Sequence, residues 1–174
     1  AFSKNNGNPQ EYSFRLGYFS HLLADSLWAD NIVKVTRERF QDQITANRDF
    51  MWKIKKDWYG LDFVYVRNHP QSLFWRVFLN CDYPVNYLDF LIHEGVRQRI
   101  SYIKEYYQKQ DEKTDELTNR EWSYLTAQQM DTYIEQTSRN IDTIFDYLEG
   151  ENTPPEGIHS ALEIPLPVSM VDRQ

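Results

Sequence analysis

His21 and Asp25 are the two residues whose types and spacing point most directly to chemistry. They are four positions apart in a segment with helical periodicity, so both side chains project from one face of a helix. An imidazole and a carboxylate at this spacing are a common way to present two ligands to one metal ion. Gly17, one turn earlier, leaves that face open to close approach. The alternative is that His21 and Asp25 hydrogen-bond only to each other on a helix surface.

Two further carboxylates, Asp57 and Asp62, flank residues 58–61. Residues five apart lie about 140° from each other around a helix, so these two share a face only if Gly60 distorts it. One hypothesis makes either Asp62 or Asp57 a metal ligand. The favoured alternative is a solvent-facing Asp57 and a buried, hydrogen-bonded Asp62.

His93 is a candidate to join His21 if it faces the centre of a helical bundle. Its apolar neighbours leave the direction of its side chain open, and a structural histidine with satisfied hydrogen bonds is the favoured interpretation. His69 precedes Pro70, and the residue before a proline disfavours helical geometry, so His69 is expected where the chain enters a helix.

The elements that must position these residues are helices. From Gln10 to about Ala29, apolar side chains recur three and four positions apart, which is typical of a helix in the middle of a bundle. The charged segment 109–121 is expected to be a solvated loop, and the Pro-rich residues 151–174 an irregular tail. The pattern predicts an all-α bundle of five to six helices in one domain over residues 1–150, with further helices over residues 31–44, 47–66, 70–79, 86–108 and 126–149.

Composition limits the classes of function. The net charge of −7 argues against a broad nucleic-acid-binding surface. The single cysteine, Cys81, excludes an intrachain disulfide and favours a reducing compartment, so a cytoplasmic location is expected. No apolar run reaches the length of a transmembrane helix. The tyrosines Tyr102, Tyr106 and Tyr107 suggest a partner surface and make a homo-oligomer a possibility.

Residues 16–25, which contain His21 and Asp25, resemble the helix that carries an H-x-x-x-D motif in the zinc-dependent phospholipase C family. Relatives of that family include the P1-type nucleases. The resemblance extends over residues 1–30 and beyond them only to the helical architecture. It implies that His21 is a zinc ligand and that Asp25 is a ligand able to bridge two ions. In the family, a zinc cluster activates a water molecule for attack on phosphorus.

The chain departs from the family pattern at other ligand positions. The family's H-x-x-x-E pair is matched only by His159 and Glu163, which lie in the Pro-rich tail. Where the family has a second histidine about ten residues after the first, this chain has Asn31 next to Asp30. Family ligands that precede the helix have no histidine counterpart before His21. The resemblance therefore implies either an N-terminally truncated member or an incomplete metal site.

The resemblance and the departures from it imply two hypotheses. The first is a zinc-dependent hydrolase of small phosphodiester or phospholipid substrates. The second is a non-enzymatic helical scaffold or interaction protein that keeps the bundle but has an incomplete site. For the first, the metal ligands are His21 and Asp25, with Asp62, Asp30 and His93 as further candidates, and the substrate pocket is walled by Phe14, Tyr18 and Trp28.

Overall fold

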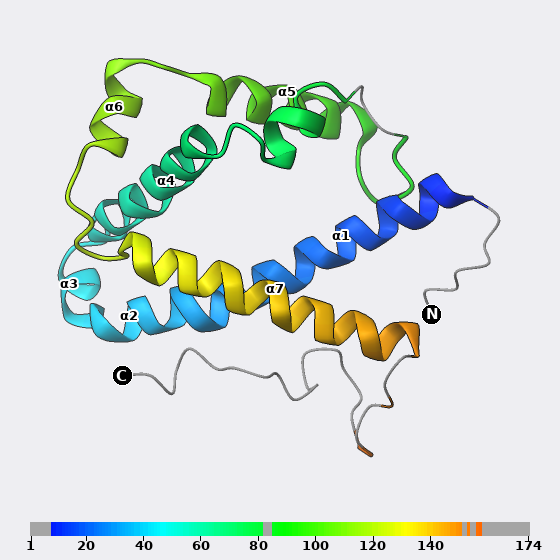
Figure 1. Cartoon of the computed structure of the whole chain (residues 1–174). Coiled ribbons are helices and arrows are strands. Elements are labelled where there is room, and N and C mark those ends of the chain that lie inside the picture. The colour runs from blue at the N-terminus through cyan, green and yellow to red at the C-terminus, as the bar shows by residue number, and fades with distance from the viewer. Residues whose placement is uncertain (1–7, 82–84, 151–152, 154–155, 158–174) are drawn as a thin grey trace. The chain divides into compact units, whose positions relative to one another are not determined.

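The computed structural model describes residues 8–81, 85–150, 153 and 156–157. Within these residues all regular structure is helical, which confirms the all-α prediction (Figure 1). No helix in the described part of the chain combines the length and apolar character needed to cross a membrane. The elements are α1 (Pro9–Trp28), η1 (Ala29–Lys34), α2 (Val35–Arg39), α3 (Gln41–Ala46), α4 (Phe50–Asn68), η2 (Phe74–Phe78), α5 (His93–Gln108), α6 (Glu112–Thr118) and α7 (Ala127–Glu149), where η denotes a π-helix.

The helices sort into two compact units. The first unit is drawn from residues 1–47 and 128–174, and the second unit from residues 48–127. The first therefore contains α1 to α3 and most of α7, whereas the second contains α4 to α6.

Helix α1 begins where its sequence favours a start. The side chain of Asn8 accepts hydrogen bonds from the backbone N–H groups of Gln10 (3.1 Å) and Glu11 (3.3 Å), and Pro9 occupies the first turn. The predicted end near Ala29 is only a change of helix type, because Ala29 keeps helical backbone angles and the chain continues through η1 and α2. The break comes at Phe40, where φ is −115° and ψ is 26°.

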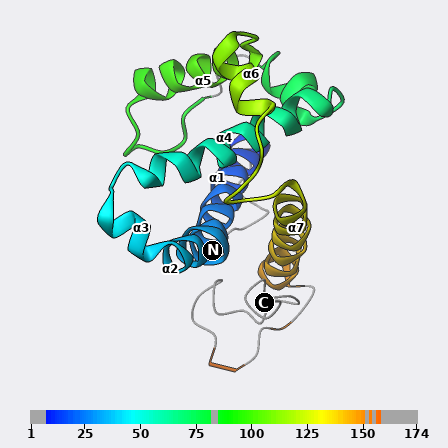
Figure 2. The ribbon, with the colours of Figure 1, turned by 90° about the vertical axis from the view of Figure 1, so that its left-hand side faces the viewer.

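The core of the first unit lies where α1 and α7 pack against each other; the two helices cross in the view of Figure 1, and Figure 2 shows them from the side. Leu23 of α1 and Ile144 of α7 are buried at its centre. Near the C-terminal end of α1, the rings of Trp28 and Tyr133 meet edge to face with centroids 5.1 Å apart. The predicted helix over residues 126–149 is confirmed as α7, and Gly150 ends it with a positive φ of 81°.

Helix α4 is the centre of the second unit. Helix α4 runs unbroken through Gly60, so no break there brings Asp57 and Asp62 onto one face. A Cβ atom at Gly60 would lie 2.4 Å from the backbone oxygen of Leu117 and 2.6 Å from the Trp122 ring. Glycine is therefore required because α6 and the segment after it approach the backbone of α4 closely. The buried apolar residues of α4 are Ile54, Trp58, Leu61, Phe63 and Val66.

Two predicted boundaries in the second unit are wrong. The segment 109–121, expected to be a loop, contains α6, which begins with a capping box between Asp111 and Thr114. The helix expected to start at Asn86 starts at His93. Asn86 instead holds a turn, because its side chain accepts a hydrogen bond from the Leu88 N–H (3.0 Å) and donates one to the Leu91 carbonyl (2.9 Å).

Candidate functional site

His21 and Asp25 lie one turn apart on α1, as the sequence predicts. The Nε2 atom of His21 is 3.4 Å from Oδ2 of Asp25, and the side chains are 64% and 66% exposed. Ligand atoms 2.0–2.2 Å from a tetrahedral zinc ion are about 3.4 Å apart, so this spacing fits two corners of such a site. It fits an exposed ion pair equally well. Nothing lies within 4 Å of where a Cβ at Gly17 would stand, so the preceding turn is open.

Helix α7 contributes a residue to this region that sequence reasoning did not identify as part of a site. The hydroxyl of Tyr133 donates a hydrogen bond to the backbone oxygen of Ala24, at 3.0 Å. Burial raises the pKa of Tyr133; a hydrogen bond with Thr137 opposes this, and the nearby charge of Asp25 adds to it. Tyr133 therefore secures the turn of α1 that carries Asp25. No local signal marks this role, because the two hydrogen-bonded residues are 109 positions apart.

The remaining candidate ligands do not complete the pair in the described part of the chain. Asp30 is exposed on η1. Asp62 and His93 belong to the second unit, where His93 is the exposed first residue of α5. His159 and Glu163 lie outside the described residues. No group of three or more His, Cys, Asp or Glu residues that could hold a metal ion occurs among the residues described.

The fit of zinc to this ligand set is therefore partial. Catalytic zinc sites use three protein ligands and keep a fourth position for water or substrate. The described residues offer two ligands, His21 and Asp25, with suitable atoms and spacing. They do not form a complete catalytic zinc site by themselves.

The predicted pocket residues Phe14, Tyr18 and Trp28 are all half-buried on α1. Trp28 packs edge to face against Tyr133 of α7. Their role as the wall of a substrate pocket stays a prediction.

Asp62 is hydrogen-bonded, as the favoured interpretation expected. Its Oδ2 accepts a hydrogen bond from the Tyr107 hydroxyl at 3.2 Å, and the residue is largely enclosed. Burial raises the pKa of Asp62 to about 6, against the lowering effect of this hydrogen bond. Desolvation therefore outweighs the stabilisation that the tyrosine gives to the ionised carboxylate.

Asp57 was expected to face solvent, and that expectation is wrong, because the residue is fully buried. Its Oδ2 accepts hydrogen bonds from the backbone N–H groups of Tyr124 (2.7 Å) and Leu125 (3.4 Å). Its other oxygen is 3.2 Å from Nε of Arg120, in an ion pair. Asp57 therefore fastens the segment that follows α6 onto α4, which is a structural role.

The predicted tyrosine surface is partly internal to the second unit. The rings of Tyr106 and Tyr107 pack on Phe63, with centroids 5.0 and 5.2 Å from it. Tyr102 is 49% exposed and stacks on Tyr106. Self-association through this helix stays a prediction.

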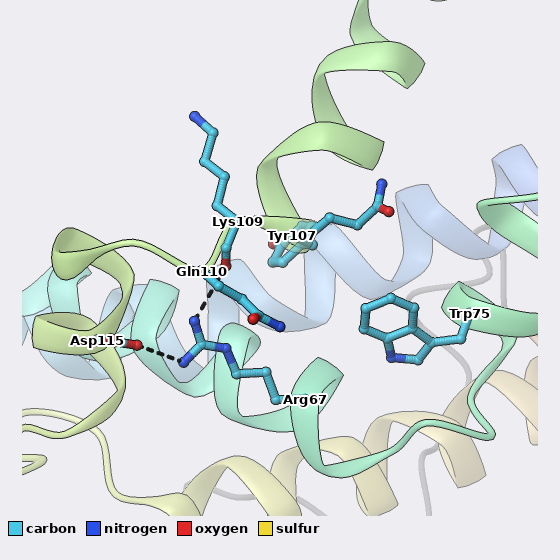
Figure 3. A pocket seen from close by; sticks show the side chains of 7 residues that line it. Arg67, Trp75, Tyr107, Lys109, Gln110 and Asp115 are labelled. Carbon is cyan, nitrogen blue, oxygen red and sulfur yellow. Dashed lines mark hydrogen bonds and ion pairs between the residues drawn. The ribbon is translucent and has the colours of Figure 1, made fainter.

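The second unit contains a pocket of about 580 Å³, part of which is shown in Figure 3. Arg67 lies at one side of it and is held in place by hydrogen bonds to Asp115, Thr118, Thr114 and the backbone oxygen of Lys109. Sequence reasoning missed this pocket because it treated the segment 109–121 as a loop. The residues that line it are Arg67, Trp75, Tyr107, Gln108, Lys109, Gln110 and Asp115.

The chain matches no protein-family model, no curated protein and no solved structure.

Proposed function

We propose that the protein is a zinc-dependent hydrolase of small phosphodiester or phospholipid substrates, with His21 and Asp25 among its metal ligands. The observation that supports this proposal is the pair itself. Two exposed side chains of the right chemical types hold their ligand atoms 3.4 Å apart beside an open turn of α1. Exposure matters because a metal ion must reach the ligands, and neither side chain is buried in apolar packing.

Each of the two residues has a defined part in this proposal. His21 binds through Nε2 in its neutral form, and Asp25 binds through a carboxylate oxygen. Tyr133 keeps the backbone between them in place through its hydrogen bond to Ala24. Bound zinc lowers the pKa of a coordinated water and stabilises developing negative charge, which is the chemistry that phosphoester hydrolysis needs.

The proposal requires at least one ligand beyond the two in the described residues. His159 and Glu163 are the candidates from the sequence, and they are tested directly by substitution. If His159 is a ligand, His159→Ala weakens zinc binding as strongly as His21→Ala does. If only His21→Ala and Asp25→Ala weaken it, the missing ligand lies elsewhere.

The test combines zinc analysis with an assay. Protein purified without chelator should contain at least about one zinc ion per chain. It should also hydrolyse bis(p-nitrophenyl) phosphate, and a chelator should stop this reaction. His21→Ala and Asp25→Ala should lower both zinc content and hydrolysis. The matched control is Arg139→Ala, which breaks another exposed i, i+4 ion pair, with Glu135 on α7, and should change neither. Folded protein that neither binds zinc nor hydrolyses the ester contradicts the proposal.

A second candidate function is a non-enzymatic helical scaffold or interaction protein. It is favoured by one observation: the described residues form no metal-binding group larger than the pair. Under this alternative, His21 and Asp25 are only an exposed ion pair. Folded protein without zinc, and without loss of stability in His21→Ala, is the result that favours it.

We also infer a reducing compartment, such as the cytoplasm. Cys81 is the single cysteine of the chain and is half-buried, with its thiol donating to the Phe78 carbonyl at 3.1 Å. Because no intrachain disulfide is possible, the fold does not depend on oxidation. A reductant should therefore leave the midpoint of thermal unfolding unchanged.

A further inference from the structure

The pocket of the second unit has the size and the composition of a small-molecule site. Its volume of about 580 Å³ lies within the range usual for ligand pockets, about 300–1,000 Å³. Its lining combines two aromatic rings with amide and charged side chains, all from residues 67–115. Neither His21 nor Asp25 lines it, so ligand binding here does not depend on the proposed zinc site.

Trp75 provides a fixed aromatic wall. Its indole Nε1 donates a hydrogen bond of 2.7 Å to the backbone oxygen of Val66, and Phe74 meets the ring edge-on at 5.2 Å. These contacts hold the plane of the indole before any ligand arrives. A flat ring that is already ordered is a suitable surface for stacking a planar heterocycle, because little conformational entropy is lost on binding.

Gln110 provides hydrogen-bonding capacity opposite this wall. In Figure 3 its amide points toward Trp75. The side chain is exposed and makes no hydrogen bond within the described part of the chain, so its donors and its acceptor are available. An amide that donates and accepts at once matches the edge of a nucleobase, as glutamine matches adenine.

The charges at the pocket favour an anionic group. Two cations, Arg67 and Lys109, and one carboxylate, Asp115, line it, which gives a local excess of one positive charge. Arg67 is fixed by its four hydrogen bonds and its guanidinium also lies over the Phe63 ring, at 5.8 Å. It therefore acts through its field. The exposed side chain of Lys109 holds its ammonium 5.9 Å from the centre of the Tyr106 ring and points away from Trp75 in Figure 3, so it reaches a phosphate in the pocket only after a change of rotamer.

We propose that this pocket binds a nucleoside monophosphate, with its base stacked on Trp75 and read by Gln110, and its phosphate near Lys109 and Arg67. The ring of Trp75 and the amide of Gln110 indicate that the ligand carries a base, and the net positive charge of the lining indicates that it carries a phosphate. A simple anion site would not need the indole wall or the Gln110 amide, and a purely apolar ligand would leave the amide and the cations unused.

The test is isothermal titration calorimetry of the full chain with AMP, in the presence of EDTA so that zinc chemistry cannot consume the ligand. Parallel titrations use adenosine and inorganic phosphate. AMP should bind with a dissociation constant below about 1 mM, the upper end of ordinary substrate affinities. Adenosine should bind several-fold more weakly, and phosphate should not saturate in the same range.

Variants place the binding in the pocket. Gln110→Ala should weaken AMP binding about tenfold, in line with the loss of a bidentate amide–base contact. The matched control is Gln71→Ala, an exposed glutamine of the same unit that does not line the pocket and should have no effect. Lys109→Ala should weaken AMP several-fold and leave adenosine unchanged.

Three results would overturn this proposal. The first is that AMP does not saturate the protein up to about 10 mM, which is ten times the upper end of ordinary substrate affinities. The second is that Gln110→Ala and Gln71→Ala have equal effects on AMP binding, and the third is that inorganic phosphate binds as tightly as AMP. Because EDTA is present throughout, a failure of the proposed zinc site leaves this result unaffected. The chain's folding in each variant is checked by circular dichroism, since Gln110 and Gln71 are both exposed and neither substitution should alter it.

Discussion

The two units of the molecule place their charged residues differently. The first unit contains 14 Asp and Glu against 7 Lys and Arg, so it carries the whole net charge of −7, whereas the second contains 12 of each and is neutral. In the second, Asp57 is fully buried and paired within the fold. In the first, Asp25 is two-thirds exposed beside His21.

This contrast separates two uses of a carboxylate. A buried carboxylate must be paired, and once it is paired within the fold it has no capacity left for a ligand. An exposed one contributes little to stability but remains available to bind. Asp57 belongs to the first kind and Asp25 to the second, although both lie on long helices.

The largest effect should come from removing Asp57. Asp57→Ala leaves Arg120 without its partner and the N–H groups of Tyr124 and Leu125 without an acceptor, at a cost of about 3–5 kcal/mol in the free energy of unfolding. Asp25→Ala should cost less than about 0.5 kcal/mol. Urea unfolding of the two variants checks the difference. Similar losses in both would mean that the contrast between the units is not real.

The next effect concerns Asp62 and pH. Its pKa is 3.8 in an unfolded chain and about 6 in the fold, so the folded state holds the proton more tightly. The contribution of protonated Asp62 to the free energy of unfolding is therefore fully present below its unfolded pKa of 3.8. This contribution is lost as pH rises through its folded pKa of about 6. The loss is about 3 kcal/mol at about 1.4 kcal/mol per pKa unit, as an order of magnitude.

Asp62→Asn should remove this dependence on pH. Relative to the wild type, the variant should gain stability steadily as pH rises from about 4 to about 7, since the cost of ionising a buried carboxylate has gone. Urea unfolding of both proteins at several pH values measures the difference, and subtraction cancels the other titrating groups. A difference that does not change with pH would show that Asp62 is not desolvated.

Two glycine-to-alanine substitutions should have smaller effects on stability, and these effects should be opposite in sign. Gly60→Ala places a methyl group 2.4 Å from a backbone oxygen, so α6 must shift, at a cost of about 1–3 kcal/mol. Gly17→Ala meets nothing within 4 Å on an exposed turn of α1 and should stabilise by about 0.5–1 kcal/mol. Thermal unfolding should therefore shift in opposite directions. A stabilising Gly60→Ala would contradict the close approach of α6 to α4.

The sequence predicts α1 and α7 well because long amphipathic helices repeat their apolar residues over many turns. It predicts α6 and the start of α5 poorly. Helix α6 is short and charged, and the signal that reveals it is the cap between Asp111 and Thr114 rather than an apolar stripe. Asn86 has the character of a helix cap but uses its side chain to hold a turn.

In the candidate site, too, the sequence predicts some features and misses others. His21 and Asp25 are predictable because one turn of one helix sets their spacing. The burial of Asp57 and the anchoring of Arg67 are not, because their partners lie 67 and 48 positions further along the chain. Contacts over such separations depend on packing that periodicity does not encode.

We propose that the exposed pair of the first unit, His21 and Asp25, binds a metal ion and is not needed to hold the fold. Thermal unfolding with and without zinc tests it directly. Zinc at about 100 times its dissociation constant should stabilise the wild type by about 2.7 kcal/mol, which for a chain of this length raises the midpoint by roughly 5–10 °C. His21→Ala should unfold at the wild-type temperature without zinc and show no rise with it. An equal rise in both proteins, or no rise in either, would contradict the claim.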